Sequence, residues 1–178
     1  LATDTAASVI STGAWSSGGS LNSARGFLSG AGTQTAAQVQ GGQNPPSSTK
    51  ALTEQYNGSA WTEVADLNQA RSYLTGAGSQ TATIVAGGYN GSTADYAVSE
   101  SWNGSAWTEV NDLNTARYNI GGAGLSTAGI AIGGVVSTPA TSAKVESYDG
   151  TNWTEITGLN TARNDVAAAG PYTQTLAF

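Results

Sequence analysis

Short apolar segments alternate with turn residues along the chain, and residues 71–110 show the pattern most clearly. A small apolar segment at 72–78 is followed by "ATIVAGG" at 82–88, "AVSESW" at 97–102 and "AWTEV" at 106–110. The continuous β-branched run predicts a strand buried on both faces, and the alternation after position 106 predicts a strand with one outward face. Asn103 and Gly104 predict a tight two-residue hairpin turn in which both residues have positive φ. We therefore expect four antiparallel strands in this segment.

This pattern recurs at a constant interval of 46 residues, without insertion or deletion. The phrase "WTEVNDLNTAR" at 107–117 resembles the start of a helix, but "YNIGGAG" follows it and places glycines where a helix needs side chains. Tandem four-stranded sheets with a period in the forties predict an all-β fold, the β-propeller, in which each antiparallel sheet forms one blade around an axis. The positions that recur unchanged are Trp15, Trp61, Trp107 and Trp153, Arg25, Arg71, Arg117 and Arg163, and the pairs Gly41 and Gly42, Gly87 and Gly88, and Gly133 and Gly134.

The repeated residues also resemble a known family. A double glycine closes an apolar strand, an aromatic residue stands five positions before a Trp, and an "L..AR" segment follows. This combination resembles the kelch motif over nearly the whole chain, and it is similar to kelch-like repeats in virion structural proteins of marine bacteriophages. The resemblance implies a propeller fold and a tail- or fibre-associated adhesion module.

The phase of the repeat predicts how the ring closes. We expect a single domain over residues 1–178, with blades at about 25–64, 71–110 and 117–156, an N-terminal half-blade at 7–17 and a closing half-blade at 163–178. The first half-blade keeps Trp15 but has Ser8 where Glu54 stands one repeat later. Pairing the two half-blades completes a fourth blade and covers two open sheet edges. We expect a four-bladed monomer; in the alternative, the chain is an excerpt of a longer array, or two chains form a dimer that completes a larger ring.

Composition and charge narrow the set of partners. Only 10% of the residues are charged, the net charge is −6, and two lysines and four arginines form no basic stripe. Nucleic acid and membrane surfaces are therefore not expected as partners. The apolar runs are too short to cross a bilayer, and the lack of cysteine leaves the redox compartment undetermined.

The repeated arginines and tryptophans have a functional and an architectural interpretation. The arginines could surround the axis and bind an anion, but we favour pairing of each with a Glu such as Glu63, Glu109 or Glu155, or with loop carbonyl groups. The tryptophans could stack on sugars, but one per blade is better explained by packing between adjacent sheets. Because a ligand site usually breaks symmetry, we look for function where the repeats differ.

The loops between the second and third strands of each blade differ most. They span 43–50, 89–96 and 135–142, and in a propeller they share one end with the connections between blades. Variable loops on a rigid scaffold commonly carry recognition, although they can also be loops that merely tolerate change. The candidate binding residues, whose rings and polar groups suit a glycan or protein surface, are Gln43, Asn44, Tyr89, Asn90, Asp95 and Tyr96.

Catalysis is not expected. The sequence has no His and no Cys, so it offers no ordinary general base for a Ser nucleophile, no thiolate and no imidazole metal ligand, and we expect neither cofactor nor metal. A glycan-processing hydrolase that uses Asp and Glu is one alternative, but "SYDGTNW" at 147–153 only approximates the Asp-box of propeller sialidases. The leading hypothesis is a non-enzymatic binding or structural module with an extracellular or virion-associated location. A purely structural or designed scaffold is the remaining alternative.

Overall fold

The computed structural model describes residues 18–44, 46, 48–92, 94–136, 140–170 and 176–177. Every regular element in these ranges is a β-strand, and none of them is helical. The all-β class that the apolar pattern predicts is therefore confirmed.

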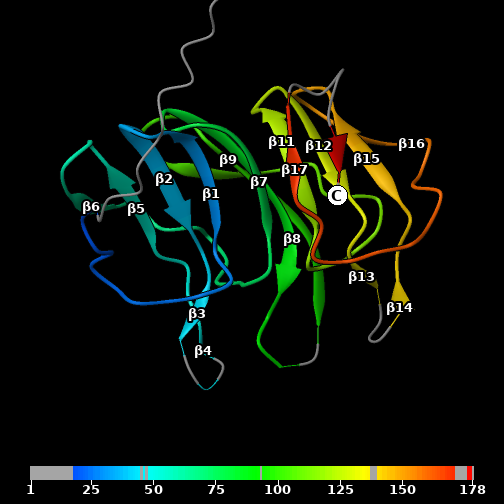
Figure 1. Cartoon of the computed structure of the whole chain (residues 1–178), viewed down its shortest axis with the longest axis horizontal. Coiled ribbons are helices and arrows are strands. Elements are labelled where there is room, and N and C mark those ends of the chain that lie inside the picture. The colour runs from blue at the N-terminus through cyan, green and yellow to red at the C-terminus, as the bar shows by residue number, and fades with distance from the viewer. Residues whose placement is uncertain are drawn as a thin grey trace, which may run out of the picture.

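Three four-stranded antiparallel sheets make up the body of the molecule (Figure 1), and each takes all its strands from one repeat. Sheet 1 contains β1 (Ser29–Thr33), β2 (Ala36–Gln40), β5 (Thr53–Tyr56) and β6 (Trp61–Val64). Sheet 2 contains β7 (Thr75–Ser79), β8 (Ala82–Tyr89), β9 (Asp95–Trp102) and β10 (Trp107–Val110). Sheet 3 contains β11 (Gly121–Leu125), β12 (Ala128–Ile132), β15 (Val145–Tyr148) and β16 (Trp153–Ile156).

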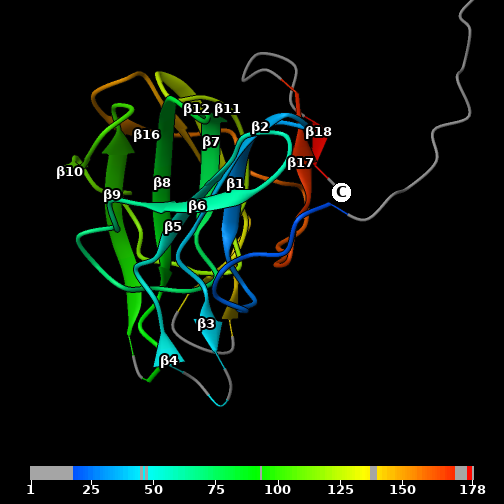
Figure 2. The same cartoon turned by 90° about the vertical axis from the view of Figure 1, so that its left-hand side faces the viewer.

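The segments expected as loops between second and third strands are mostly short hairpins. After β2, β3 (Gln43–Asn44) pairs with β4 (Ser48–Thr49), and after β12, β13 (Val135–Val136) pairs with β14 (Ala140–Thr141). In sheet 2, β8 and β9 themselves extend into the equivalent hairpin, with a register shift between Ala86 and Gly88. All three hairpins project from the same end of the molecule, at the bottom of Figures 1 and 2. We refer to this end as the hairpin end.

A fourth unit begins after sheet 3. Here β17 (Ala168–Ala169) pairs with β18 (Leu176–Ala177) in an antiparallel arrangement. The inner strands follow one another through the molecule, because β1 lies beside β7, β7 beside β11, and β11 beside β17. In Figure 1 these strands lie toward the middle, and the outer strands β6 and β16 lie on opposite sides. The half-blade predicted at 7–17, including Trp15, lies outside the described residues.

The paired glycines join each sheet to the next. Gly87 and Gly88 both have positive φ, and the Gly88 N–H donates a hydrogen bond to the Arg117 carbonyl oxygen at 2.9 Å. A Cβ on Gly87 would lie only 2.6 Å from the same carbonyl oxygen. The glycine pairs of the other two repeats also have positive φ and make the equivalent contacts. A side chain would block this approach, which explains why each repeat keeps both glycines.

The hairpin at Asn103 and Gly104 differs from the predicted two-residue turn. Trp102 pairs with Trp107, so the loop spans 103–106, and only Gly104 has positive φ. The Asn103 Oδ1 accepts hydrogen bonds from the backbone N–H groups at positions 105 and 106, at 2.9 and 3.0 Å. The prediction of two positive-φ residues is therefore wrong, because the Asn side chain stabilises a longer turn while its own backbone stays in an ordinary conformation.

Buried aromatic side chains connect neighbouring sheets. The indole N–H of Trp107 in sheet 2 donates to Thr53 Oγ1 of sheet 1 at 3.0 Å. Trp153 of sheet 3 donates in the same way to Ser99 Oγ of sheet 2, also at 3.0 Å. Both indoles are buried in apolar clusters that include residues of the adjacent sheet. This is the position that packing between sheets requires.

Candidate functional site

Each of the three complete sheets holds one buried ion pair. In sheet 2, Arg71 Nη1 lies 2.5 Å from Glu100 Oε1, and neither side chain has exposed surface. Asn68 donates its backbone N–H and its side-chain amide to Glu100 Oε2 at 2.7 and 2.8 Å, and the Gln69 N–H lies 3.4 Å from Oε1. We call such a set of donors a carboxylate cup. It consists of an Asn, the residue after it and the Arg three positions beyond the Asn. The cup supplies donors to both oxygens of the Glu carboxylate.

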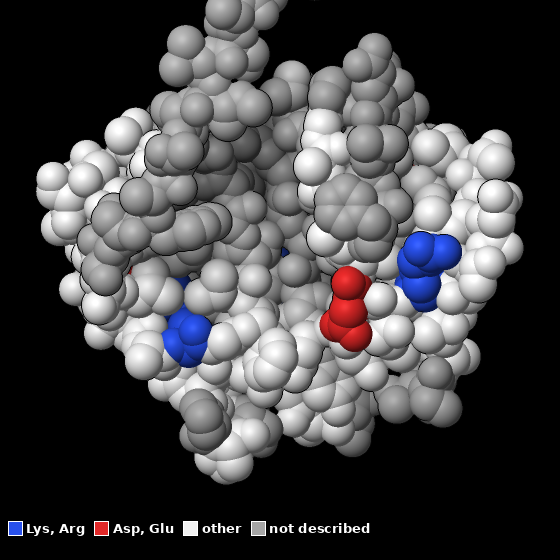
Figure 3. All heavy atoms as spheres, viewed as in Figure 1, with Lys and Arg blue, Asp and Glu red and all other residues white. Residues whose placement is uncertain are grey.

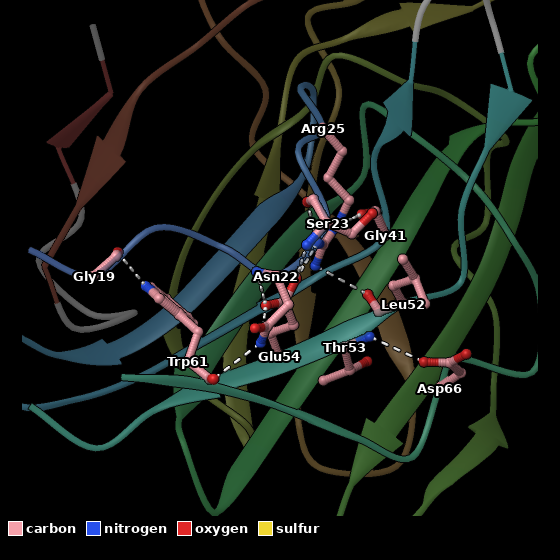
Figure 4. A network of polar contacts seen from close by, with 10 residues as sticks. All are labelled: Gly19, Asn22, Ser23, Arg25, Gly41, Leu52, Thr53, Glu54, Trp61 and Asp66. Carbon is pink, nitrogen blue, oxygen red and sulfur yellow. Dashed lines mark hydrogen bonds and ion pairs between the residues drawn. The ribbon is translucent and has the colours of Figure 1, made fainter. Parts of the chain in front are cut away.

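Sheet 1 repeats the carboxylate cup (Figure 4). Glu54 pairs with Arg25 and accepts the backbone N–H and side-chain amide of Asn22 at 2.7 and 3.0 Å. Arg25 also donates to the carbonyl oxygens of Gly41 and Ser23 at 2.9 and 3.0 Å. Burial by itself raises the pKa of Glu54, but hydrogen bonds from Arg25, Asn22 and Ser23, together with the Arg25 charge, outweigh burial and hold the pKa below its ordinary value of 4.5.

Sheet 3 contains the third cup. Arg117 Nη2 lies 3.0 Å from Glu146 Oε1, and Asn114 donates its backbone N–H and side-chain amide to Glu146 Oε2 at 2.7 and 2.8 Å. Burial lowers the pKa of Arg117, and the negative charges of Glu146 and Glu155 offset part of this effect. In all three sheets the ion pair ties the connection that precedes the sheet to the third strand of the same sheet.

The Glu partners predicted from the sequence are wrong. Glu63, Glu109 and Glu155 are exposed on the outer strands β6, β10 and β16, and Glu155 pairs with Lys144 at 2.5 Å. The carboxylates in the cups come instead from β5, β9 and β15. An outer strand has a sheet neighbour on one side only, whereas these third strands lie between two others, where a carboxylate meets the buried guanidinium.

Arg163 departs from the other three arginines. It is exposed, and its guanidinium has no hydrogen-bond or ion-pair partner within the part of the chain that the structure describes. The equivalence of the arginines in the sequence therefore does not extend to burial and pairing.

A second group of residues lies at the hairpin end. Phe27, Tyr73, Asn119 and Asp165 occupy the same position in successive repeats, and each has a left-handed backbone with φ between 53° and 56°. The Tyr73 N–H donates to the Phe27 carbonyl oxygen at 2.8 Å, Asn119 N–H to that of Tyr73 at 3.0 Å, and Asp165 N–H to that of Asn119 at 3.1 Å. We call these four residues the left-handed row. A left-handed backbone costs a residue with a side chain roughly 1–2 kcal/mol, so the hydrogen bonds along the row help to hold it.

Aromatic rings extend from the left-handed row onto the hairpins. The rings of Phe27 and Tyr73 are stacked with centroids 4.2 Å apart, and Tyr118 meets Tyr73 edge-on at 6.0 Å. Tyr89, at the end of β8, lies 5.2 Å from Tyr118. Burial raises the pKa of Tyr73, with further contributions from the charge of Asp165 and from Tyr118. We call Phe27, Tyr73, Tyr118 and Tyr89 the aromatic cluster. Phe27 lies at one end of this cluster and is 55% exposed.

The predicted binding residues fall into two groups. Tyr89 belongs to the aromatic cluster, and Gln43 Oε1 accepts a hydrogen bond from Ser72 Oγ at 3.1 Å, next to the left-handed row. The Asn90 Oδ1 accepts hydrogen bonds from backbone N–H groups at positions 92 and 94, at 2.9 and 3.1 Å, so this side chain shapes its own turn. The three other predicted residues lie half-buried in the hairpin strands: Asn44, Asp95 and Tyr96.

Sequence reasoning missed Phe27, Tyr73 and Tyr118. A signal was present, because the position two residues after the invariant Arg reads Phe, Tyr, Asn and Asp in successive repeats. This variation stands directly beside the most constant part of the repeat, and it was passed over because the segment was interpreted as an inner strand.

Two features are absent from the described residues: a cluster of metal-binding side chains and a membrane-spanning helix. These residues contain no group of three or more His, Cys, Asp or Glu side chains that could hold a metal ion. Within the same residues no helix is long and apolar enough to cross a membrane. Comparison of the sequence with protein-family models and with curated proteins finds no match.

Proposed function

We propose that this chain is a four-bladed β-propeller that binds a ligand and catalyses no reaction. Three observations support the ring: three sheets have adjacent inner strands, β17 continues the series beside β11, and β17 and β18 begin a fourth sheet. Residues 7–17, which keep Trp15 but have Ser8 at the Glu position, are a diverged copy of the two strands that this fourth blade needs. A monomer of 17.8 kDa in light scattering is the expected result, and a stable dimer contradicts closure within one chain.

The left-handed row is the observation that carries the binding proposal. All other positive-φ positions in the described chain hold glycine, which adopts this backbone without cost, yet these four hold Phe, Tyr, Asn and Asp. Residues in sparsely populated backbone conformations cluster at active sites and ligand-binding sites. Four different side chains on one repeated backbone position also give the symmetry-breaking surface that a specific ligand requires.

A glycan is the ligand class that this surface suits best. The exposed Phe27 ring, stacked on Tyr73, offers a flat apolar face, and Asn119 and Asp165 of the same row add an amide and a carboxylate that form hydrogen bonds to hydroxyl groups. The side of the molecule in Figure 3 shows few charged groups among the described residues, in keeping with the 10% of charged residues in the sequence.

The hydrolase alternative receives no support from the carboxylate that motivated it. Asp149 is exposed in a hairpin turn and accepts the N–H groups of Thr151 and Asn152 at 2.8 and 2.7 Å. These hydrogen bonds lower the pKa of Asp149, whereas a general acid needs a raised pKa. The kelch resemblance alone leads us to propose an extracellular or virion-surface location.

A glycan array with the purified chain tests the binding proposal. Phe27→Ala and Tyr73→Ala should each weaken binding of an array hit by about tenfold or more, since central aromatic contacts dominate such interfaces. Leu125→Ala is the matched control, because Leu125 is 62% exposed but lies at the far end of β11 from Asn119. Absence of any bound glycan, or an equal loss with Leu125→Ala, contradicts the proposal.

A further inference from the structure

The three filled carboxylate cups define what the fourth copy of the same segment can bind. Each filled cup has the sequence Asn-x-Ala-Arg, and Asn160, Thr161, Ala162 and Arg163 form the fourth copy. In the filled cups the Asn donates twice to one carboxylate oxygen and the Arg pairs with the other. The segment at 160–163 carries the same donors.

The backbone of the fourth segment is held as it is in the filled cups. The Leu159 N–H donates to the Ala143 carbonyl oxygen at 2.8 Å, and the Arg163 N–H donates to that of Ser142 at 3.2 Å. The Arg163 carbonyl oxygen accepts the Gly134 N–H at 2.9 Å. The equivalent bonds around Arg117 measure 3.0, 3.1 and 2.9 Å. All these contacts of the fourth segment are made to the connections of sheet 3, so its conformation does not depend on a carboxylate.

Among the residues that the structure describes, none places a carboxylate in the fourth segment. Asn160, Thr161 and Arg163 are exposed, and no described side chain forms a hydrogen bond or ion pair with them. In the proposed four-bladed ring, the residue at the Glu position of the fourth blade is Ser8, one repeat before Glu54. Serine has no charge and is too short to reproduce a Glu carboxylate.

We propose that residues 160–163 form a binding site for a carboxylate group that this cup does not receive from its own blade. A carboxylate matches the donors best because it is planar, carries one charge and presents two oxygens, as Glu100 does to its cup. Phosphate and sulfate are tetrahedral, whereas the filled cups surround a planar group with two oxygens. The carboxylate belongs either to a small anion or to an acidic side chain on a partner strand. This inference rests on the proposed ring only for the role of Ser8.

An NMR titration with sodium acetate tests the site, because acetate reproduces the carboxylate end of a Glu side chain. We expect saturable shifts of the Asn160 and Thr161 backbone N–H signals in about the millimolar range, relative to sodium chloride at the same ionic strength. The equivalent backbone N–H signals of Asn68 and Gln69, whose cup is filled, should not shift and serve as the internal control. Arg163→Gln should weaken acetate binding by about tenfold or more. Shifts that do not saturate, or that survive Arg163→Gln unchanged, overturn the proposal.

Two further experiments identify the source of the carboxylate and test whether the ring closes. A peptide that copies residues 97–102, and so carries the Glu of a filled cup, is compared with its Gln version. Binding about tenfold tighter than acetate, lost in the Gln version, assigns the site to an acidic strand, whereas binding no tighter than acetate assigns it to a small anion. Ser8→Glu should abolish acetate binding. If acetate binds equally well to Ser8→Glu and to the unmodified chain, the result supports the carboxylate site at residues 160–163 and contradicts the four-bladed ring.

Discussion

Removing the charge of Glu100 tests whether the cups hold the sheets together. Glu100→Gln keeps the size and shape of the side chain, but it leaves the buried Arg71 guanidinium without a counter-charge. One of the two terminal atoms also changes from an acceptor to a donor, although Asn68, Gln69 and Arg71 all direct donors at this group. Removing one partner of a buried pair costs roughly 3–5 kcal/mol. With a urea m-value of about 2 kcal/mol per M, the midpoint should fall by about 1.5–2.5 M.

Arg163→Gln is the matched control for this experiment. It also removes one charge from the Arg and Glu series, but Arg163 is exposed and has no described partner. Its effect on the free energy of unfolding should stay within about 0.5 kcal/mol. Urea unfolding followed by tryptophan fluorescence measures both variants. A loss below about 1 kcal/mol for Glu100→Gln, or equal losses for the two variants, would refute the view that the filled cups stabilise the fold.

Three further predictions concern other buried groups. Trp153→Phe removes the indole N–H that bonds Ser99 across two sheets, and we expect a loss of about 1–2 kcal/mol in urea unfolding. Gln40→Ala should instead raise stability by about 1–2 kcal/mol, because both amide atoms of Gln40 are buried without a partner and the next repeat has Ala86 there. The folded-state pKa of Glu54 lies below 4.5, so its contribution to stability is present above that pH and is lost as pH falls through the folded-state pKa. The urea midpoint of Glu54→Gln should therefore vary less over this acid range than the midpoint of the unmodified chain.

The strand order could be predicted from the sequence because it depends on local patterns. Apolar runs, turn residues and a constant period determine where a strand begins and ends, and "ATIVAGG" at 82–88 falls wholly within β8. The glycine pairs were visible for the same reason. Their contact with the next Arg carbonyl oxygen was not, since it depends on how two sheets meet.

The choice of ion-pair partner illustrates what local patterns leave open. Glu54 and Glu63 lie opposite one another on β5 and β6, so both recur in every full repeat at the same cross-strand position. The period of the repeat therefore cannot show which of the two Glu residues pairs with the Arg. Burial separates them: the inner strand of the two has a neighbour on each side, so its carboxylate is the one that meets Arg25.

The repeat itself separates architecture from recognition. A position that must satisfy the same neighbours in every sheet keeps the same residue, as the Arg of each filled cup does. A position whose backbone is fixed by the repeat but whose side chain is free of that requirement can vary, and the left-handed row does so from Phe27 to Asp165. Arg163 keeps the residue type and the backbone contacts of the series, but no described carboxylate pairs with it. The two binding proposals therefore rest on independent observations: donors of constant type that no described carboxylate meets, and side chains that vary on one strained backbone position.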